Sequence, residues 1–151
     1  MAYRIDVATS VAPAEGDEID RQHAAYEAAH GVVCDYQAFI MTLRSETGDL
    51  IGALRAYTAY AEIYVDDLWI DDGHRRHGLG KALLSALEDR YRDQGYNNIN
   101  LVTSAFQAAP FYEKCGFEKE FVRVNRHHPA LTKTFFVKYF KNETQNRGVV
   151  F

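Results

Sequence analysis

A strand, a glycine-containing turn and a helix follow one another between residues 61 and 91. The residues of Ala61–Ile70 are typical of a strand. Residues 75–80 read Arg-Arg-His-Gly-Leu-Gly, and an apolar-periodic helix begins at Lys81. The first backbone N–H groups of a helix have no partner within the helix and lie at the positive end of its dipole. The junction therefore predicts a site for an anionic group such as a phosphate.

The junction differs from two common phosphate-binding loops. No Gly-Lys-Ser or Gly-Lys-Thr follows the four-residue gap of a Walker loop, and the glycine spacing is not the Gly-x-Gly-x-x-Gly of dinucleotide-binding folds. Taken alone, the segment also fits an ordinary glycine-containing loop with a solvated basic cluster.

A second block lies downstream, where residues 107–117 read Gln-Ala-Ala-Pro-Phe-Tyr-Glu-Lys-Cys-Gly-Phe. This block and the earlier Arg75-x-x-Gly78-x-Gly80 resemble, in order and spacing, the motifs of the GNAT superfamily of acetyl-CoA-dependent N-acetyltransferases. The resemblance runs from about Asp49 to Phe140. Within the superfamily, the strings at 67–70 and 106–112 are similar to a subgroup of small bacterial members with no settled substrate.

The resemblance implies a mixed α/β fold, in which a twisted, mostly antiparallel sheet carries a central parallel strand pair that splays apart. Flanking helices cover the sheet. The residue patterns predict strands at Tyr3–Ala8, Asp35–Arg44, Leu50–Ala59, Ala61–Ile70, Asn98–Thr103, Phe117–Asn125 and Leu131–Phe140, and helices at Ala14–His30, Lys81–Tyr91 and Ala108–Lys114, stopped by Gly31, Gly95 and Gly116. A helix joins the strands at 61–70 and 98–103, so these two should be parallel neighbours.

Composition bounds the class of protein. At 151 residues we expect one domain over residues 1–141, followed by a polar tail at 142–151. The net charge of −4 argues against general affinity for nucleic acid. No apolar run has the length of a membrane span, and the first residues lack the layout of a signal peptide. Cys34 and Cys115 show no metal or disulfide spacing, so a reduced, cytoplasmic protein is expected.

The resemblance assigns each part of acetyl-CoA to a segment of the chain. The diphosphate is expected on the backbone amides of residues 76–81, with Arg75 adding charge. The pantetheine arm should lie between the splayed strands, with backbone N–H groups near Leu68 and Trp69 polarising the thioester carbonyl. The full expected set is Leu68, Trp69, Ile70, Arg75, Arg76, His77, Gly78, Leu79, Gly80, Lys81, Thr103, Gln107 and Lys114.

Tyr112 corresponds to the family's general acid, which protonates the departing thiolate of CoA. For deprotonating or orienting the amine, Asp66 and Asp67 are the candidates, and strand alternation would put them on opposite faces. Glu62 and a relay through water are the alternatives. No metal is expected, because the pairs His74/His77 and His127/His128 lack further ligands in sequence, and Cys115 is expected to be a packed thiol.

The sequence therefore predicts transfer of an acetyl group from acetyl-CoA to a primary amine. The acidic cluster Asp66, Asp67, Asp71 and Asp72 suggests a small cationic acceptor. A CoA-binding sensor without catalysis and a protein lysine or N-terminal acetyltransferase are the alternatives. A homodimer formed through the C-terminal strands would use the apolar residues Phe135, Phe136, Tyr139 and Val149–Phe151.

Overall fold

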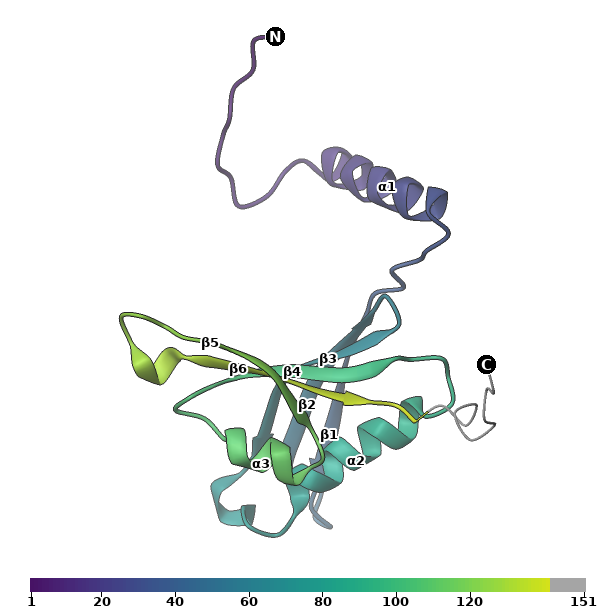
Figure 1. Ribbon diagram of the computed structural model, residues 1–151. Coiled ribbons are helices and arrows are strands. Elements are labelled where there is room, and N and C mark those ends of the chain that lie inside the picture. The colour runs from purple at the N-terminus through teal and green to yellow at the C-terminus, as the bar shows by residue number, and fades with distance from the viewer. Residues whose placement is uncertain (142–151) are drawn as a thin grey trace, which may run out of the picture. The chain divides into compact units, whose positions relative to one another are not determined.

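The computed structural model describes residues 1–141, which divide into a unit over Met1–Cys34 and a second unit that begins at Asp35 (Figure 1). The assignment of both units to one domain stays a prediction. The expected contribution of Val149–Phe151 to a dimer lies outside the described residues.

The first unit contains one helix, α1 (Pro13–Ala29). Its start is fixed by the proline at the first helical position and by Glu15, whose carboxylate accepts a hydrogen bond from the Ala12 N–H at 3.1 Å. Gly31, with φ +70°, follows the C-cap as predicted. The predicted strand at Tyr3–Ala8 is wrong, because these exposed residues pair with none of the described strands and local alternation cannot supply a partner.

The second unit is built on a six-stranded mixed sheet (Figure 1). The strands are β1 (Gln37–Arg44), β2 (Leu50–Ala59), β3 (Glu62–Ile70), β4 (Asn98–Ser104), β5 (Glu118–Arg123) and β6 (Lys133–Tyr139), in the spatial order β1-β2-β3-β4-β6-β5. All neighbours are antiparallel except β3 and β4, which are parallel. The predicted sheet, with its one parallel pair, is thereby confirmed.

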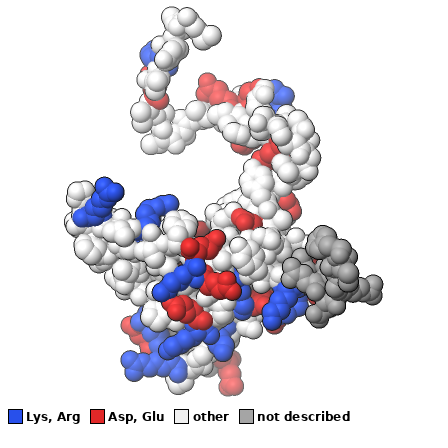
Figure 2. Space-filling view, viewed as in Figure 1, with Lys and Arg blue, Asp and Glu red and all other residues white. Residues whose placement is uncertain are grey.

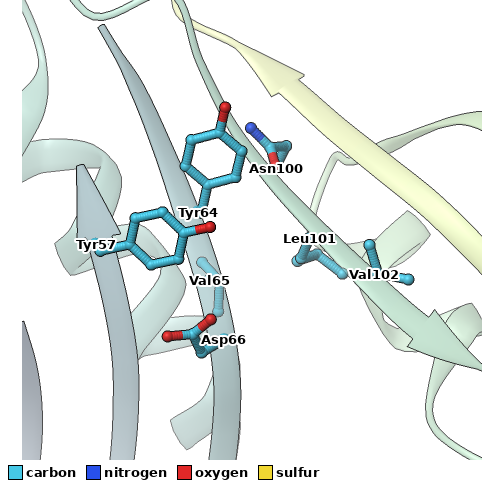
Figure 3. Close-up of a pocket in the computed structure, with 7 residues that line it drawn as sticks. All are labelled: Tyr57, Tyr64, Val65, Asp66, Asn100, Leu101 and Val102. Carbon is cyan, nitrogen blue, oxygen red and sulfur yellow. The ribbon is translucent and has the colours of Figure 1, made fainter. Parts of the chain in front are cut away.

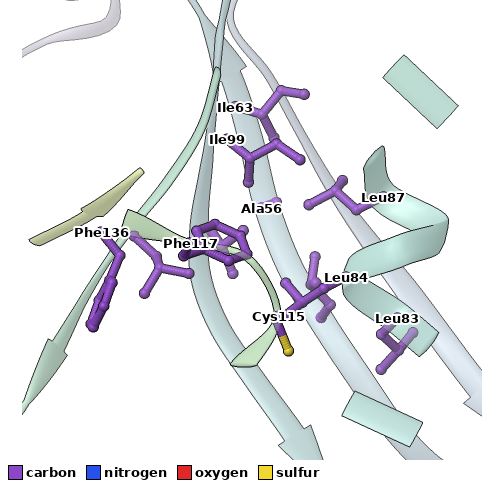
Figure 4. Packing of buried hydrophobic residues seen from close by; sticks show 12 residues of the cluster. Ala56, Ile63, Leu83, Leu84, Leu87, Ile99, Cys115, Phe117 and Phe136 are labelled. Carbon is purple, nitrogen blue, oxygen red and sulfur yellow. The ribbon is translucent and has the colours of Figure 1, made fainter. Parts of the chain in front are cut away.

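Helices α2 (Leu79–Tyr91) and α3 (Ala109–Lys114) follow β3 and β4, and short 3-10 turns lie at Asp72–His74 and Pro129–Leu131. The apolar stripe of α2, formed by Leu83, Leu84 and Leu87, packs on one face of the sheet (Figure 4). The predicted end of this helix at Tyr91 is confirmed, but the helix stops before Gly95 is reached. Arg92 already leaves the helical conformation with ψ 138°, and Asp93 has φ +59°, so the helix stops at Tyr91.

The core that fixes these elements is contributed by β2, β3, β4, β6 and α2. Leu54, Ile63, Leu87 and Phe136 are fully buried within it. Figure 4 labels the last three. Burial of Phe136 means that this residue cannot belong to an exposed dimer surface, as the sequence had suggested. Lys138 joins β6 to the helices, since its ammonium lies 2.6 Å from a Glu88 carboxylate oxygen on α2 and donates to the Cys115 carbonyl after α3 at 3.1 Å.

The parallel pair separates halfway along its length. Pairing between β3 and β4 runs from Glu62 opposite Asn98 to Val65 opposite Leu101, and stops there. Beyond that point each strand still pairs with its other neighbour, β3 with β2 and β4 with β6. We call residues 66–70 of β3 and 102–104 of β4 the unpaired segments. The splayed pair predicted from the family resemblance is confirmed.

A bulge in β3 lies at the point of separation. Val65 pairs with Ala56 and Asp67 pairs with Arg55 of β2, so Asp66 is an extra residue with no partner of its own. A bulge bends its strand and increases the local twist. It therefore accounts for the departure of β3 from β4 directly after Val65.

Candidate functional site

The unpaired segment of β3 directs backbone groups away from β2. The Asp71 N–H donates to the Ile51 carbonyl at 2.9 Å, and hydrogen-bonded pairs alternate along an antiparallel ladder. Trp69 therefore points its amide at β2, whereas Leu68 and Ile70 point theirs toward the side of β4. The Ile70 carbonyl, on that same side, accepts a hydrogen bond from Arg75 Nε at 3.1 Å. Of the two amides expected to polarise a thioester, Leu68 has the required direction and Trp69 does not.

The loop between β3 and α2 is held in place by its own acidic residues. The Asp71 carboxylate accepts hydrogen bonds from the Gly73 N–H at 3.2 Å and from His74 Nδ1 at 2.9 Å. The contact with His74 is the main reason that the pKa of Asp71 is lowered. Asp72 lies 2.8 Å from Arg75 Nη1. Both aspartates thus shape the loop.

The same loop presents turned backbone amides at the start of α2. Arg76 has φ +66° and Gly78, the N-cap of α2, has φ +75°, both in the left-handed region. Successive amides in such conformations form a concave anion site, which the helix N-terminus extends. Figure 2 shows Lys and Arg side chains over the part of the second unit where Figure 1 places this loop and α3, and some acidic side chains lie among them. The geometry fits the diphosphate site that the sequence predicts at residues 76–81.

Gly80 lets the first turn of α2 approach the rest of the site. A Cβ atom at this buried position would lie 3.0 Å from Phe111 Cζ and 3.6 Å from Leu68 Cδ2. Helix α2, the aromatic residues of α3 and the unpaired segment of β3 therefore meet at a position where a side chain does not fit without displacing its neighbours. Leu79 beside it is half-buried, and His77 and Lys81 are exposed.

Tyr112 is held by aromatic neighbours. Its ring contacts Phe111, Phe117 and Phe136 with centroid separations of 5.2, 6.0 and 5.8 Å. Burial raises the pKa of the Tyr112 phenol above its ordinary value, and electrostatic interactions with the Cys115 and Asp67 side chains add to the shift. The phenol therefore keeps its proton at neutral pH, as a proton donor must. The influence of Asp67 also shows that these two residues lie within electrostatic reach.

The raised pKa of Tyr112 gives a prediction for the alkaline range. We expect kcat/KM to rise with pH as the acceptor amine loses its proton, with no decline from loss of the Tyr112 proton below pH of about 10. The neutral phenol stabilises the fold below its unfolded pKa, and this contribution is lost as pH rises through the raised value. A pH–rate profile checks the expectation. A declining limb well below pH 10 that disappears in Tyr112→Phe would contradict it.

The two candidate carboxylates lie on the same face of the sheet. Asp67 accepts a hydrogen bond from Arg55 Nε at 2.7 Å, and Asp66 lines a pocket together with Tyr57. Arg55 and Tyr57 are two residues apart on β2 and so share a face. The prediction that Asp66 and Asp67 point to opposite faces is therefore wrong, because the bulge adds a residue and shifts the alternation.

The side chain of Gln107 binds the last residues of β4. Its side-chain oxygen accepts hydrogen bonds from the Ser104 N–H at 2.8 Å and from Thr103 Oγ1 at 3.2 Å. The oxygen of Gln107 therefore orders the loop, and the Thr103 side chain is buried. Lys114 is exposed and, like Lys81, takes part in no ion pair within residues 1–141.

A pocket of about 200 Å³ lies where β3 and β4 part, and sequence reasoning missed most of it (Figure 3). It is lined by Tyr57, Tyr64, Val65, Asp66, Asn100, Leu101 and Val102. Tyr60 and Ala61 both have positive φ and form a two-residue turn of the type I′ class, which brings Tyr57 opposite Tyr64. Neither residue is a glycine, asparagine or aspartate of the kind that marks such a turn in a sequence, so this pairing carried no sequence signal.

Burial is the main reason that the pKa of the Cys115 thiol is raised, so this group is a poor nucleophile. Residues 1–141 contain no group of three or more His, Cys, Asp or Glu side chains placed to hold a metal ion. Among the same residues, no helix is long and apolar enough to span a membrane.

The acetyltransferase (GNAT) family model matches residues 7–117 of the chain, from before α1 to the end of the second motif. The chain belongs to this family. It is an acetyl-CoA-dependent N-acetyltransferase. The blasticidin-S acetyltransferase of Streptomyces morookaense is 33% identical over 94 residues, which cover 62% of this chain and 68% of the relative. An acetyltransferase of Agrobacterium fabrum is 29% identical over 114 residues, covering 75% of this chain and 83% of the relative.

Solved structures of acetyltransferases share the fold. An acetyltransferase from Agrobacterium tumefaciens superposes with a TM-score of 0.71 at 26% identity, covering 91% of this chain and 100% of the other. A streptothricin acetyltransferase from Bacillus anthracis, solved in complex with acetyl coenzyme A, superposes with a TM-score of 0.61 at 21% identity. The match covers 69% of this chain and 63% of the other.

Proposed function

We propose that this enzyme transfers the acetyl group of acetyl-CoA to the primary amine of a small cationic molecule, by direct attack within a ternary complex. The observation that carries the proposal is the end of pairing between β3 and β4 beyond Val65 and Leu101. An amide-rich pantetheine arm can pair with exposed strand edges as an additional strand. The turned amides at Arg76 and Gly78 would receive the diphosphate at the start of α2.

The reaction would use groups that the fold holds near the unpaired segments. The amine nitrogen would attack the thioester carbon to form a tetrahedral adduct. As the C–S bond breaks, the sulfur would take the proton of the Tyr112 phenol. The nitrogen would lose its remaining extra proton to solvent, and a proton from solvent would restore the phenol. The Leu68 N–H, which points toward the side of β4, would stabilise the oxyanion that forms on the carbonyl. The proton of the acceptor ammonium would pass to Asp66, to Asp67 or to water before the attack.

Two relatives support a small acceptor. They are named for blasticidin S and for streptothricin. The pocket of about 200 Å³ beside Asp66 has a size suited to part of such a molecule. We further propose that the enzyme acts in the cytoplasm, where two free thiols such as Cys34 and Cys115 stay reduced, and that it binds neither nucleic acid nor membranes. A homodimer remains part of the proposal.

Release of CoA thiol in the presence of candidate amines tests the proposal, with mass spectrometry to show the acetylated product. We expect thiol release to depend on a cationic primary amine and the product to gain one acetyl group. Binding of CoA with no transfer to any amine would instead favour a sensor. A clear preference for anionic amino acids would contradict a cationic acceptor.

A further inference from the structure

The pocket beside Asp66 lies on the face of the sheet opposite α2. Its residues Tyr57, Tyr64 and Asn100 alternate along β2, β3 and β4 with side chains buried in the core. The pocket begins where β3 and β4 stop pairing. A ligand held here would therefore face the unpaired segments from the side of the sheet that the helices α2 and α3 leave uncovered.

The wall of the pocket is aromatic. The rings of Tyr57 and Tyr64 stack with centroids 4.9 Å apart and planes at 10° (Figure 3). The ring of Tyr36 also contacts Tyr57, with centroids 5.3 Å apart. The Tyr64 hydroxyl donates to Glu62, which also accepts a hydrogen bond from Asn98 Nδ2 at 2.9 Å. The rings are thus fixed in place. Aromatic walls of this kind attract flat apolar groups and organic cations.

The negative charge at the pocket is smaller than the sequence suggests. Of the four aspartates in the acidic cluster, Asp67 is paired with Arg55, Asp71 with His74 and Asp72 with Arg75. Asp66 makes no ion pair within residues 1–141, and it is the one charged residue among those that line the pocket. Its carboxylate lies close enough to Tyr57 to help raise the pKa of that phenol, after burial. The pocket therefore offers one carboxylate to a ligand.

We propose that this pocket is the acceptor subsite, and that it selects an amine with a single ammonium group carried on a flat apolar body. The ammonium lies at Asp66 and the body lies against Tyr57 and Tyr64. The inference rests on the proposed acetyl transfer and narrows its acceptor class. A polyamine fits less well, because its second charge would meet no second carboxylate among the residues that line the pocket.

Two primary amines test the preference in the full-length protein. Benzylamine has one positive charge and a flat ring, whereas 1,5-diaminopentane has two positive charges and no ring. We expect kcat/KM to be about tenfold higher for benzylamine. Asp66→Asn should raise the KM for benzylamine about tenfold, because the ammonium group loses a charge-assisted hydrogen bond. The dissociation constant of CoA should stay unchanged. Tyr57→Leu should abolish the preference for benzylamine.

Matched controls are available on other surfaces. Asp89→Asn removes an exposed carboxylate from α2, and Tyr3→Leu removes an exposed ring from the chain before α1. Both should leave the kinetics with either amine unchanged. Binding of benzylamine to the CoA-loaded protein, followed by ligand-observed NMR, gives a readout that does not require turnover.

The outcomes separate the subsite from the transfer reaction. Benzylamine binding that Asp66→Asn abolishes supports the subsite, and the absence of any acetylated product would then overturn the transfer alone. Acetylation with the same kinetics in all pocket variants overturns the subsite and leaves the transfer standing. The subsite is also overturned if the wild-type protein prefers 1,5-diaminopentane, or if it neither binds nor acetylates benzylamine.

Discussion

Replacing Tyr112 by Phe should lower kcat about 100-fold, the lower range for loss of a general acid, while the dissociation constant of CoA stays within about twofold. The substitution keeps the ring that contacts Phe111, Phe117 and Phe136 and removes only the hydroxyl. The departing sulfur then loses its proton donor, whereas binding of CoA through β3 and the start of α2 is unaffected. Single-turnover acetyl transfer together with calorimetry separates the two effects.

Tyr96→Phe is the matched control for this experiment. Tyr96 is a half-buried tyrosine that contacts Tyr91 at 4.9 Å and lies outside the proposed site. We expect the turnover of the Tyr96→Phe variant to equal that of the wild type. Normal turnover in Tyr112→Phe would show that water, and not this phenol, protonates the leaving group.

Replacing Gly80 by Val should weaken both the fold and the binding of CoA. The Cβ alone would lie 3.0 Å from Phe111 Cζ, and valine adds two more carbons at this buried position. Overpacking of this kind costs about 1–3 kcal/mol of unfolding free energy. Relief of the clash requires the first turn of α2 to move away from α3 and β3, which displaces the amides of the proposed diphosphate site. We expect the dissociation constant of CoA to rise at least about tenfold, which corresponds to about 1.4 kcal/mol.

Ala86→Val places the same side chain on the same helix at an exposed position. It should cost at most about 0.7 kcal/mol, through helix propensity alone, and leave CoA affinity unchanged. Denaturant unfolding and calorimetry on both variants measure the two quantities. Equal stability and equal CoA affinity in Gly80→Val and Ala86→Val would refute the packing role of Gly80.

Elements with a regular apolar period could be predicted from the sequence to within about two residues. The bounds of β2 were correct, and α2 starts two residues before its predicted position. The parallel arrangement of β3 and β4 followed from the helix between them. The strand at Tyr3–Ala8 failed because alternation is a local property, and a strand also needs a partner.

The details of the site depended on features without a sequence signal. The bulge at Asp66 contains no glycine that would mark it, yet it decides which face Asp66 and Asp67 share. The pairing of Asp71 with His74 and of Asp72 with Arg75 is set by the short turn between β3 and α2. Counting aspartates in the sequence therefore overstated the negative charge that an acceptor would meet.

Calorimetric titration with CoA tests most directly whether a nucleotide thioester lies between the unpaired segments with its diphosphate at the start of α2. We expect one CoA to bind per chain with a dissociation constant in the range of about 1–100 μM, typical of substrate affinities, and pantetheine without the nucleotide to bind far more weakly. Equal affinity for CoA and pantetheine, or no binding of CoA at millimolar concentration, would contradict the account.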